Sequence, residues 1–355
     1  MDVGKETGES ALIDGAWQAD RSLPPLVRIA RLDDLEALLR LARVGGDGLT
    51  NLPPDRATLA SKLAASNEAL ATPEVQAKGA AILLIVELAG RVVGTSCVFP
   101  NVGADWPFYS YRLTRQVSRS LAIGKRKVQT LLNLVNDFDG ECEVGGLFID
   151  PECRGHAVGK LAARARYMFI AEHREWFGSK VIAELRGYQD ESGQSPVWEA
   201  IGRHFYGMEF SEADRTGALA GNQFIADLGP RYPLYVSMLP ESAQATLGRP
   251  HDDGRPALRM LLDEGFVDGE YVDIFDGGPT LFAQINSVRS VRACVSNTVA
   301  KIGTGRDSVP SLVATGSGRE FRVTRGLAGA EGSIAPDVAR VLDCAVGDAF
   351  VHLPI

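Results

Sequence analysis

The sequence predicts an α+β fold in which a mainly antiparallel sheet is flanked by helices. Three observations predict it: a strong hairpin signal over residues 81–99, more strand candidates directly after it, and a long helical pattern that follows these strands from residue 157. A regular alternation of strands and helices, which would predict a parallel sheet, is absent from this order. With 355 residues, the chain is long enough for one large or two medium domains.

The N-terminal part begins with a polar stretch, residues 1–24, which we expect to be a mobile tail. Residues 27–30 read as a short strand. Asp33 could cap the helix that follows, whose leucines recur at helical spacing. A second amphipathic helix is expected over residues 57–70.

The central part is rich in strands. β-Branched runs on both sides of Ala89-Gly90 predict a hairpin over residues 81–99. Further strands are expected over residues 108–117, 128–135 and 142–149, and "NDFDG" between the last two is a turn sequence.

The remaining elements alternate less regularly. A helix over residues 157–177 leads to a strand over 180–185 and a helix over 195–205, and residues 211–221 are expected to be loop. Short helices follow over residues 241–247 and 254–266, then a strand, a turn and a strand over 269–285. Beyond residue 286, short apolar runs between Gly and Ser predict a small β-rich C-terminal region, 286–355.

Composition excludes several classes of protein. The formal net charge of −8 argues against a globally basic surface for nucleic acid. The five cysteines form no CxxC pair, so we expect neither a zinc site nor a disulfide framework. No signal pattern or apolar run of about 18 residues occurs. We therefore expect a cytoplasmic protein without a metal or a membrane partner.

The stretch "LFIDPECRGHAVGKL" places a small-residue loop between a strand and a helix. The first N–H groups of a helix lack internal partners and, with the helix dipole, favour an anion. Gly155, Ala157 and Gly159 would let a phosphate approach the backbone, and Arg154 and Lys160 could add charge-assisted contacts. Spacing alone leaves open whether this loop binds a phosphate or is an ordinary strand-to-helix turn.

This stretch resembles the acyl-CoA-binding motif of the GNAT superfamily of N-acyltransferases. The motif is Arg/Gln-x-x-Gly/Ala-x-Gly/Ala, and Arg154, Ala157 and Gly159 occupy its fixed positions. Longer segments, including "VIAELRGYQDESGQSPVWEAIGRHF", "GRPALRMLLDEGF" and "YVDIFDGGPT", resemble the arginine N-succinyltransferase family. The similarity runs from about Val27 to the C-terminus. The segment "GRPHDDGRPA" is a variant of the family's His-Pro segment.

The resemblance implies a GNAT-type domain over residues 25–210 and a second α/β portion, 211–285, that completes the substrate pocket. It implies transfer of succinyl from succinyl-CoA to the α-amine of L-arginine, or ornithine, by a homo- or hetero-oligomer. A non-catalytic CoA-binding subunit and an N-acyltransferase for another acyl-CoA stay open. The implied CoA contacts are Leu147, Phe148, Ile149, Arg154, Gly155, His156, Ala157, Val158, Gly159 and Lys160.

Attack of an amine on a thioester needs a base for the amine and an acid for the leaving thiolate. His251, in the variant segment, is one candidate base, since histidine titrates near pH ~6.5. Glu143, on the strand before the CoA loop, is the competing base. Tyr206 could protonate the thiolate, although "HFYGMEF" also reads as aromatic packing.

The two substrates carry charges that need partners. The guanidinium of arginine favours a bidentate carboxylate, and Glu184, Asp276 and the alternate Asp273 lie in segments that match the family. The succinyl carboxylate needs a cation, for which Arg186 is the candidate. Glu184 and Arg186 could equally form a structural pair on one strand face.

Overall fold

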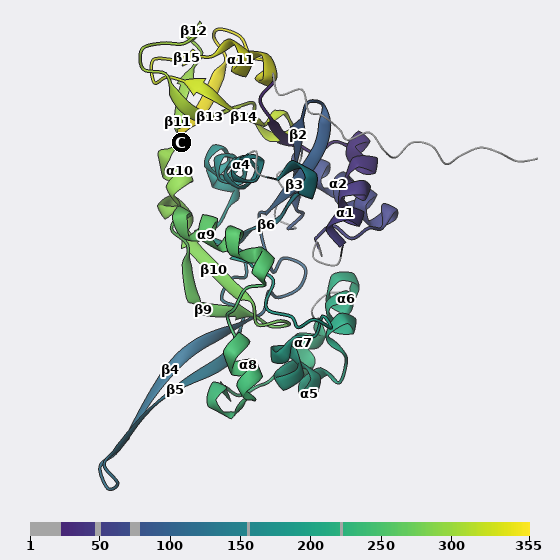
Figure 1. Cartoon of the computed structure of the whole chain (residues 1–355), viewed down its shortest axis with the longest axis vertical. Coiled ribbons are helices and arrows are strands. Elements are labelled where there is room, and N and C mark those ends of the chain that lie inside the picture. Colours follow the sequence, from purple (N-terminus) through teal and green to yellow (C-terminus); the bar gives the residue numbers. More distant parts are fainter. Residues whose placement is uncertain (1–22, 47–50, 72–78, 155–156, 221–222) are drawn as a thin grey trace, which may run out of the picture.

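The structure is a computed structural model that describes residues 23–46, 51–71, 79–154, 157–220 and 223–355. It has one long, mostly antiparallel sheet with helices on its faces (Figure 1). The strand order is β11-β16-β13-β14-β1-β2-β3-β6-β7-β10-β9-β4-β5-β8, with β12 and β15 beside β14. The predicted α+β class is confirmed.

The strands are β1 (Leu26–Ile29), β2 (Ile82–Leu88), β3 (Arg91–Phe99), β4 (Ser110–Ser120), β5 (Lys125–Val135), β6 (Cys142–Ile149), β7 (Lys180–Glu184), β8 (Leu234–Tyr235), β9 (Val267–Asp273), β10 (Pro279–Gln284), β11 (Val295–Thr298), β12 (Lys301–Ile302), β13 (Val309–Thr315), β14 (Arg322–Ala328), β15 (Ser333–Ile334) and β16 (Ala349–Pro354). The helices are α1 (Leu35–Gly45), α2 (Arg56–Ala69), α4 (Val158–Glu172), α5 (Arg203–Tyr206), α6 (Phe210–Ala220), α7 (Gln223–Leu228), α8 (Glu241–Thr246), α9 (Arg255–Glu264), α10 (Arg289–Ala293) and α11 (Pro336–Leu342). Within the described ranges, no helix combines the length and the apolarity that a membrane span requires.

The centre of the sheet is covered on both faces. Side chains alternate along β2: Leu84 and Val86 pack in the cluster that contains α4, whereas Leu83 and Ile85 pack in the cluster that contains α1 and α2. This period of two, with apolar residues at every position, is what a strand buried on both faces requires. The predicted hairpin between β2 and β3 is confirmed, with Ala89 and Gly90 both at positive φ in its turn.

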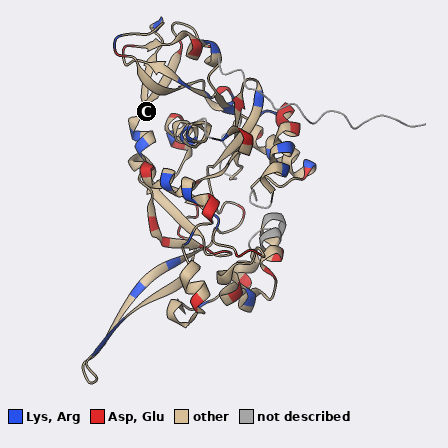
Figure 2. Cartoon of the chain, in the orientation of Figure 1, with Lys and Arg blue, Asp and Glu red and all other residues tan. Residues whose placement is uncertain are grey.

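Strands β4 and β5 form a long hairpin that projects from the body (Figure 1). They pair continuously from Ser110↔Val135 to Ser120↔Lys125, while only the base of the hairpin pairs with β9 and β8. Lysines and arginines lie along its length, as Figure 2 shows. The hairpin extends further than the strands expected from the sequence.

Helices α5 to α7 form a separate packed cluster with Trp198 at its centre. The expectation of loop at residues 211–221 is wrong over residues 211–220, which belong to α6, and residue 221 lies outside the described residues. Asp214 and Gly217 have low intrinsic helix propensity. Burial of Ala213 and packing of Phe210 in the Trp198 cluster stabilise the helix instead.

The C-terminal strands continue the main sheet. Strand β14 pairs with β1 in antiparallel fashion, from Leu26↔Thr324 to Arg28↔Arg322. The buried His173, directly after α4, also joins the two parts: its Nε2 accepts the Gly318 N–H at 2.9 Å. Residues 286–355 are therefore held to the rest of the chain by sheet pairing as well as by packing.

Candidate active site

The central feature of the site is a pair of strands that separate. Strands β6 and β7 are parallel and pair only at Cys142↔Val181 and Glu143↔Ile182. Strand β6 then continues along β3 to Ile149, whereas β7 continues along β10 to Glu184. The backbone edge of β6 beyond Glu143 is therefore available to a ligand.

A bulge in β6 lies beside this opening. Thr95↔Phe148 is followed by Cys97↔Gly145, so β6 has one residue more than β3 here. Gly146 adopts a φ of +55°, and a Cβ at this position would lie 2.6 Å from Cys97 Sγ. Only glycine fits both the conformation and the space, and the bulge turns the β6 backbone toward the opening.

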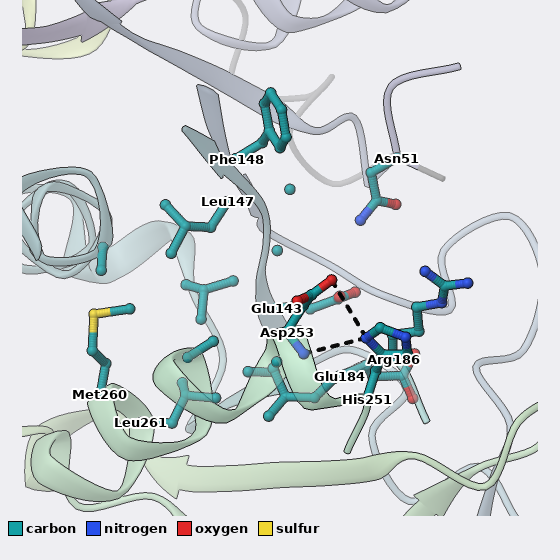
Figure 3. Close-up of a pocket in the computed structure, with 18 of the residues that line it drawn as sticks. Asn51, Glu143, Leu147, Phe148, Glu184, Arg186, His251, Asp253, Met260 and Leu261 are labelled. Carbon is teal, nitrogen blue, oxygen red and sulfur yellow. Dashed lines mark hydrogen bonds and ion pairs between the residues drawn. The ribbon is translucent and has the colours of Figure 1, made fainter. Parts of the chain in front are cut away.

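A cavity of about 670 Å³ passes through the opening. Residues of α4 and α9, such as Met260 and Leu261, line one side of β6, and Asn51, Arg186 and His251 line the other (Figure 3). Its lining includes Asn51, Phe108, Glu143, Gly145, Gly146, Leu147, Phe148, Arg154, Lys160, Arg164, Arg166, Tyr167, Glu184, Arg186, Phe210, His251, Asp253, Met260, Leu261, Asp273, Phe275 and Asp276.

Two cations at the start of α4 line the cavity, Arg154 and Lys160. The loop before them is fixed by Asp150, which accepts a hydrogen bond from Arg40 at 2.9 Å and forms an ion pair with Arg91. Ala157 precedes the helix at a φ of +57°. The described residues on either side of 155–156 therefore place Arg154 and Lys160 near a helix N-terminus, a position that favours an anion.

The expected CoA contacts divide into three groups. Those that line the cavity are Leu147, Phe148, Arg154 and Lys160. Those that the cavity lining does not include are Ile149, Ala157, Val158 and Gly159, and of these Val158 is a core residue. Gly155 and His156 lie outside the described residues.

Three carboxyl groups of the cavity lining, those of Glu143, Glu184 and Asp273, lie close enough for Glu143 and Asp273 to act electrostatically on Glu184. Burial raises the pKa of Glu143 to about 7, against the opposing field of Arg166. Burial and the neighbouring Asp273 raise the pKa of Glu184 well above its usual range. Burial, with the charge of Asp276, does the same to the pKa of Asp273. A bound cation would stabilise the ionised forms of these three carboxyls.

Asp276 has a different environment, although it also lines the cavity. Its Oδ2 accepts the Gly187 N–H at 2.7 Å, and its Oδ1 accepts the Gly278 N–H at 2.8 Å. Both oxygens therefore hold the chain after β7 against the turn between β9 and β10. Both carboxylate oxygens of Asp276 are therefore already engaged by backbone N–H groups.

His251 and Arg186 lie together at the acidic end (Figure 3). The His251 backbone N–H donates to the Arg186 carbonyl at 2.8 Å. His251 Nδ1 accepts the Asp253 N–H at 3.3 Å and lies 3.7 Å from Asp253 Oδ2. The Arg186 side chain is exposed and donates to Gln189. Among the described residues, no three metal-binding side chains group closely enough to hold an ion.

Tyr206 is the expected catalytic residue that is not in the cavity lining. It is buried and stacks on Trp198 with 5.5 Å between the ring centres, outside the cavity lining. Burial raises its pKa to about 12. These contacts favour the aromatic-packing alternative for Tyr206.

Sequence reasoning missed Arg166, which lines the cavity from the middle of α4. It shares a helix face with Ala162 and Ile170, four residues away on either side, and both are buried. The sequence feature that could have identified Arg166 is a charged residue on the apolar face of a predicted helix. Asn51 and Phe210, also in the lining, gave no such signal.

The separated strands, the bulge and the strand–loop–helix unit define the GNAT type of acyl-CoA N-acyltransferase fold. A family model described as "Arginine N-succinyltransferase beta subunit" matches residues 25–290. The chain therefore belongs to the arginine N-succinyltransferase family, as the sequence resemblance predicted.

Individual relatives agree with this assignment. The chain is 38% identical over 334 residues to an arginine N-succinyltransferase subunit beta of Pseudomonas aeruginosa, covering 93% of this chain and 98% of the relative. It is 40% identical over 274 residues to an arginine N-succinyltransferase of Yersinia pseudotuberculosis, covering 77% and 78%. The solved structure of arginine/ornithine succinyltransferase subunit AI from Pseudomonas aeruginosa has a TM-score of 0.82 and 30% identity, covering 94% of this chain and 99% of that one.

Proposed function

We propose that this chain transfers succinyl from succinyl-CoA to the α-amine of L-arginine, with ornithine as an alternative acceptor. One observation carries the proposal: a single cavity joins a cationic helix start to a group of three carboxyls through the opening between β6 and β7. The first end suits the phosphates of CoA, and the second suits a cationic amino acid.

Donor and acceptor would approach from opposite ends of the cavity. Arg154, Lys160 and the start of α4 would bind the CoA phosphates, and the β6 backbone from Leu147 would hold the pantetheine and thioester. Glu184 and Asp273 would bind the guanidinium of arginine as charge-assisted hydrogen-bond acceptors. Asp276 would keep these two carboxyls in place through the loops that it joins.

The reaction is a direct attack of the neutral amine on the thioester carbon. A base removes one proton from the amine nitrogen, the nitrogen–carbon bond forms, and the carbon–sulfur bond breaks. The sulfur leaves as a thiolate and is then protonated. Glu143, with a pKa near 7, and His251 are the two candidate bases. A polarised N–H at the β6 bulge would stabilise the developing oxyanion.

A donor-by-acceptor assay tests the proposal. The pure chain is mixed with succinyl-CoA or acetyl-CoA, and with L-arginine or L-ornithine, while CoA release is measured. The expected result is release that requires succinyl-CoA and a basic amino acid. Faster release from acetyl-CoA would support another acyl group, and binding of CoA without any release would support a non-catalytic subunit.

We also propose that the chain works as an oligomer, since two of its relatives are named as subunits. The β4–β5 hairpin offers a contact surface. It carries six cations and no anion over residues 110–135, in a chain whose net charge is −8. Val117, Leu121 and Ile123 are exposed near its tip. A two-stranded hairpin is marginally stable alone, so contact with the acidic body of a second copy would stabilise it.

Sedimentation of the pure chain tests this contact. We expect a dimer that dissociates when Leu121 and Ile123 are both replaced by Ser, and that weakens at high salt. A dimer that is unaffected by both changes would show that the hairpin is not the contact. A chain that is monomeric alone would show that a second copy is not the partner.

A further inference from the structure

Arg166 is a buried cation that faces the cavity without an acidic partner. Only 4% of the residue is exposed. Its Nε donates to the Ala163 carbonyl at 3.2 Å and its Nη1 to the Gly145 carbonyl at 3.3 Å. In the part of the chain that the structure describes, no carboxylate forms a hydrogen bond or an ion pair with it. A buried guanidinium is costly unless a counter-charge compensates it.

The other cations of the cavity have different environments. Arg164 forms an ion pair with Glu264 at 3.1 Å, and Arg186 is exposed and bound to Gln189. Arg154 and Lys160 lie at the start of α4, where the CoA phosphates are proposed to bind. Arg166 alone among these five combines burial within the cavity with contacts to neutral acceptors only.

The position of Arg166 along β6 matches the length of an acyl chain. Its contact, Gly145, lies two residues before Leu147 across the β6 bulge, a span of at most about 7 Å. If the thioester lies at Leu147, the terminal carboxylate of a four-carbon acyl group would lie within hydrogen-bonding distance of the Arg166 guanidinium. A two-carbon acetyl group would not.

We propose that Arg166 binds the terminal carboxylate of the acyl group and so selects a dicarboxylic acyl donor. This inference rests on the proposed acyl transfer and names the residue that would fix its donor. It replaces Arg186 in that role, because Arg186 is exposed and lies with the acceptor carboxyls. Glu143 acts on Arg166 electrostatically, but its own pKa is raised to about 7, so it repels a second carboxylate less than an ordinary glutamate would.

The test compares succinyl-CoA with butyryl-CoA, which has the same four carbons but no carboxylate. The measured quantity is the ratio of the two kcat/KM values at fixed L-arginine. Arg166→Met keeps the approximate shape of the side chain and removes its charge, and we expect the ratio to fall about 100-fold. Arg166→Lys should retain part of the preference, since it keeps a positive charge.

Two matched variants serve as controls. Arg174→Met removes an arginine just beyond the end of α4 and should leave the ratio at the wild-type value. Arg186→Met removes the other candidate cation and should also keep the ratio, even if it lowers both rates. Equal losses for the two donors in Arg166→Met, or collapse of the ratio in Arg186→Met alone, would overturn the inference.

Binding measurements allow the role of Arg166 to be tested even if a variant fails to fold or the chain shows no turnover. Calorimetry with free CoA shows whether Arg166→Met is folded, and Arg166→Lys takes its place if it is not. A wild-type chain that turns over neither donor would contradict the proposed function. The inference is then tested by affinity, since Arg166 predicts tighter binding of succinyl-CoA than of butyryl-CoA, and equal affinities would overturn it.

Discussion

Glu143 and Arg166 share the backbone of Gly145 as a common neighbour. Arg166 Nη1 donates to the Gly145 carbonyl at 3.3 Å, and Glu143 Oε1 lies 3.2 Å from the place that a Cβ on Gly145 would occupy. The field of Arg166 lowers the pKa of Glu143, but burial outweighs it and raises the pKa to about 7. Glu143 can therefore change its protonation state near neutral pH, beside the proposed thioester site.

The first prediction concerns the pH dependence of the reaction. A base acts in its deprotonated form, so kcat/KM of the wild type should fall as the pH falls through about 7. Glu143→Gln should lower kcat/KM by about 10²- to 10⁴-fold and remove this acidic limb. His251→Gln is the matched variant. If it removes the limb while Glu143→Gln keeps it, His251 is the base.

The second prediction concerns stability. A buried carboxyl whose pKa is raised binds its proton more tightly in the folded state than in the unfolded state. Its ionisation therefore lowers the free energy of unfolding as the pH rises from about 4.5 through about 7. At pH 8 the free energy of unfolding of Glu143→Gln should exceed that of the wild type by on the order of 1–3 kcal/mol, so the variant should unfold at a higher temperature.

The same variant should lose this advantage at pH 5, where the wild-type carboxyl is protonated in the folded state. Thermal unfolding at the two pH values checks the difference. An equal shift at pH 5 and pH 8 would show that packing, and not charge, separates the two proteins.

The third prediction concerns the acceptor. Burial and neighbouring acidic groups disfavour the ionised forms of Glu184 and Asp273 when the site is empty. A bound guanidinium would stabilise these ionised forms by its opposite charge. Glu184→Gln should lower kcat/KM for L-arginine about 10- to 100-fold. It should affect L-citrulline much less, because its side chain has the same shape without the charge. A variant that loses activity equally with both acceptors would place Glu184 elsewhere in the mechanism.

The fourth prediction concerns the bulge in β6. Gly146→Ala places a methyl group 2.6 Å from Cys97 Sγ at a φ of +55°, and should lower the free energy of unfolding by about 2–4 kcal/mol. Gly90→Ala, at a φ of +75° with no atom within 4 Å, isolates the conformational cost of about 1 kcal/mol. Denaturant unfolding measures both. Equal losses would show that the space beside Cys97 is not restrictive.

Local patterns in the sequence predicted much of the fold. The turn at Ala89-Gly90, the strands on either side of it and the helix that begins at Val158 all have short-range signals, and the structure contains each of them. The position of α6 could not be predicted in this way, because packing around Trp198 outweighs the low helix propensity of its sequence. The pairing of β14 with β1 joins residues almost 300 positions apart and has no local signal.

The candidate site was predictable only in part, for the same reason. Arg154, Lys160, Glu184 and Asp273 lie in motif segments, and the structure brings all four to one cavity. Tyr206 lies in such a segment too, yet its ring packs away from the cavity. Arg166 belongs to a helix face that packing alone turns toward β6. Motifs therefore identified residues near the site, while tertiary structure decided which of them face it.

The most direct test of the account is the identity of the product. The pure chain is incubated with succinyl-CoA and L-arginine, and CoA release is compared with the formation of succinylated arginine by mass spectrometry and NMR. We predict one succinyl group on the α-nitrogen of arginine for each CoA released. CoA release without this product, or succinylation of the guanidinium, would contradict a cavity in which the carboxyl groups hold the side chain and leave the α-amine free to attack.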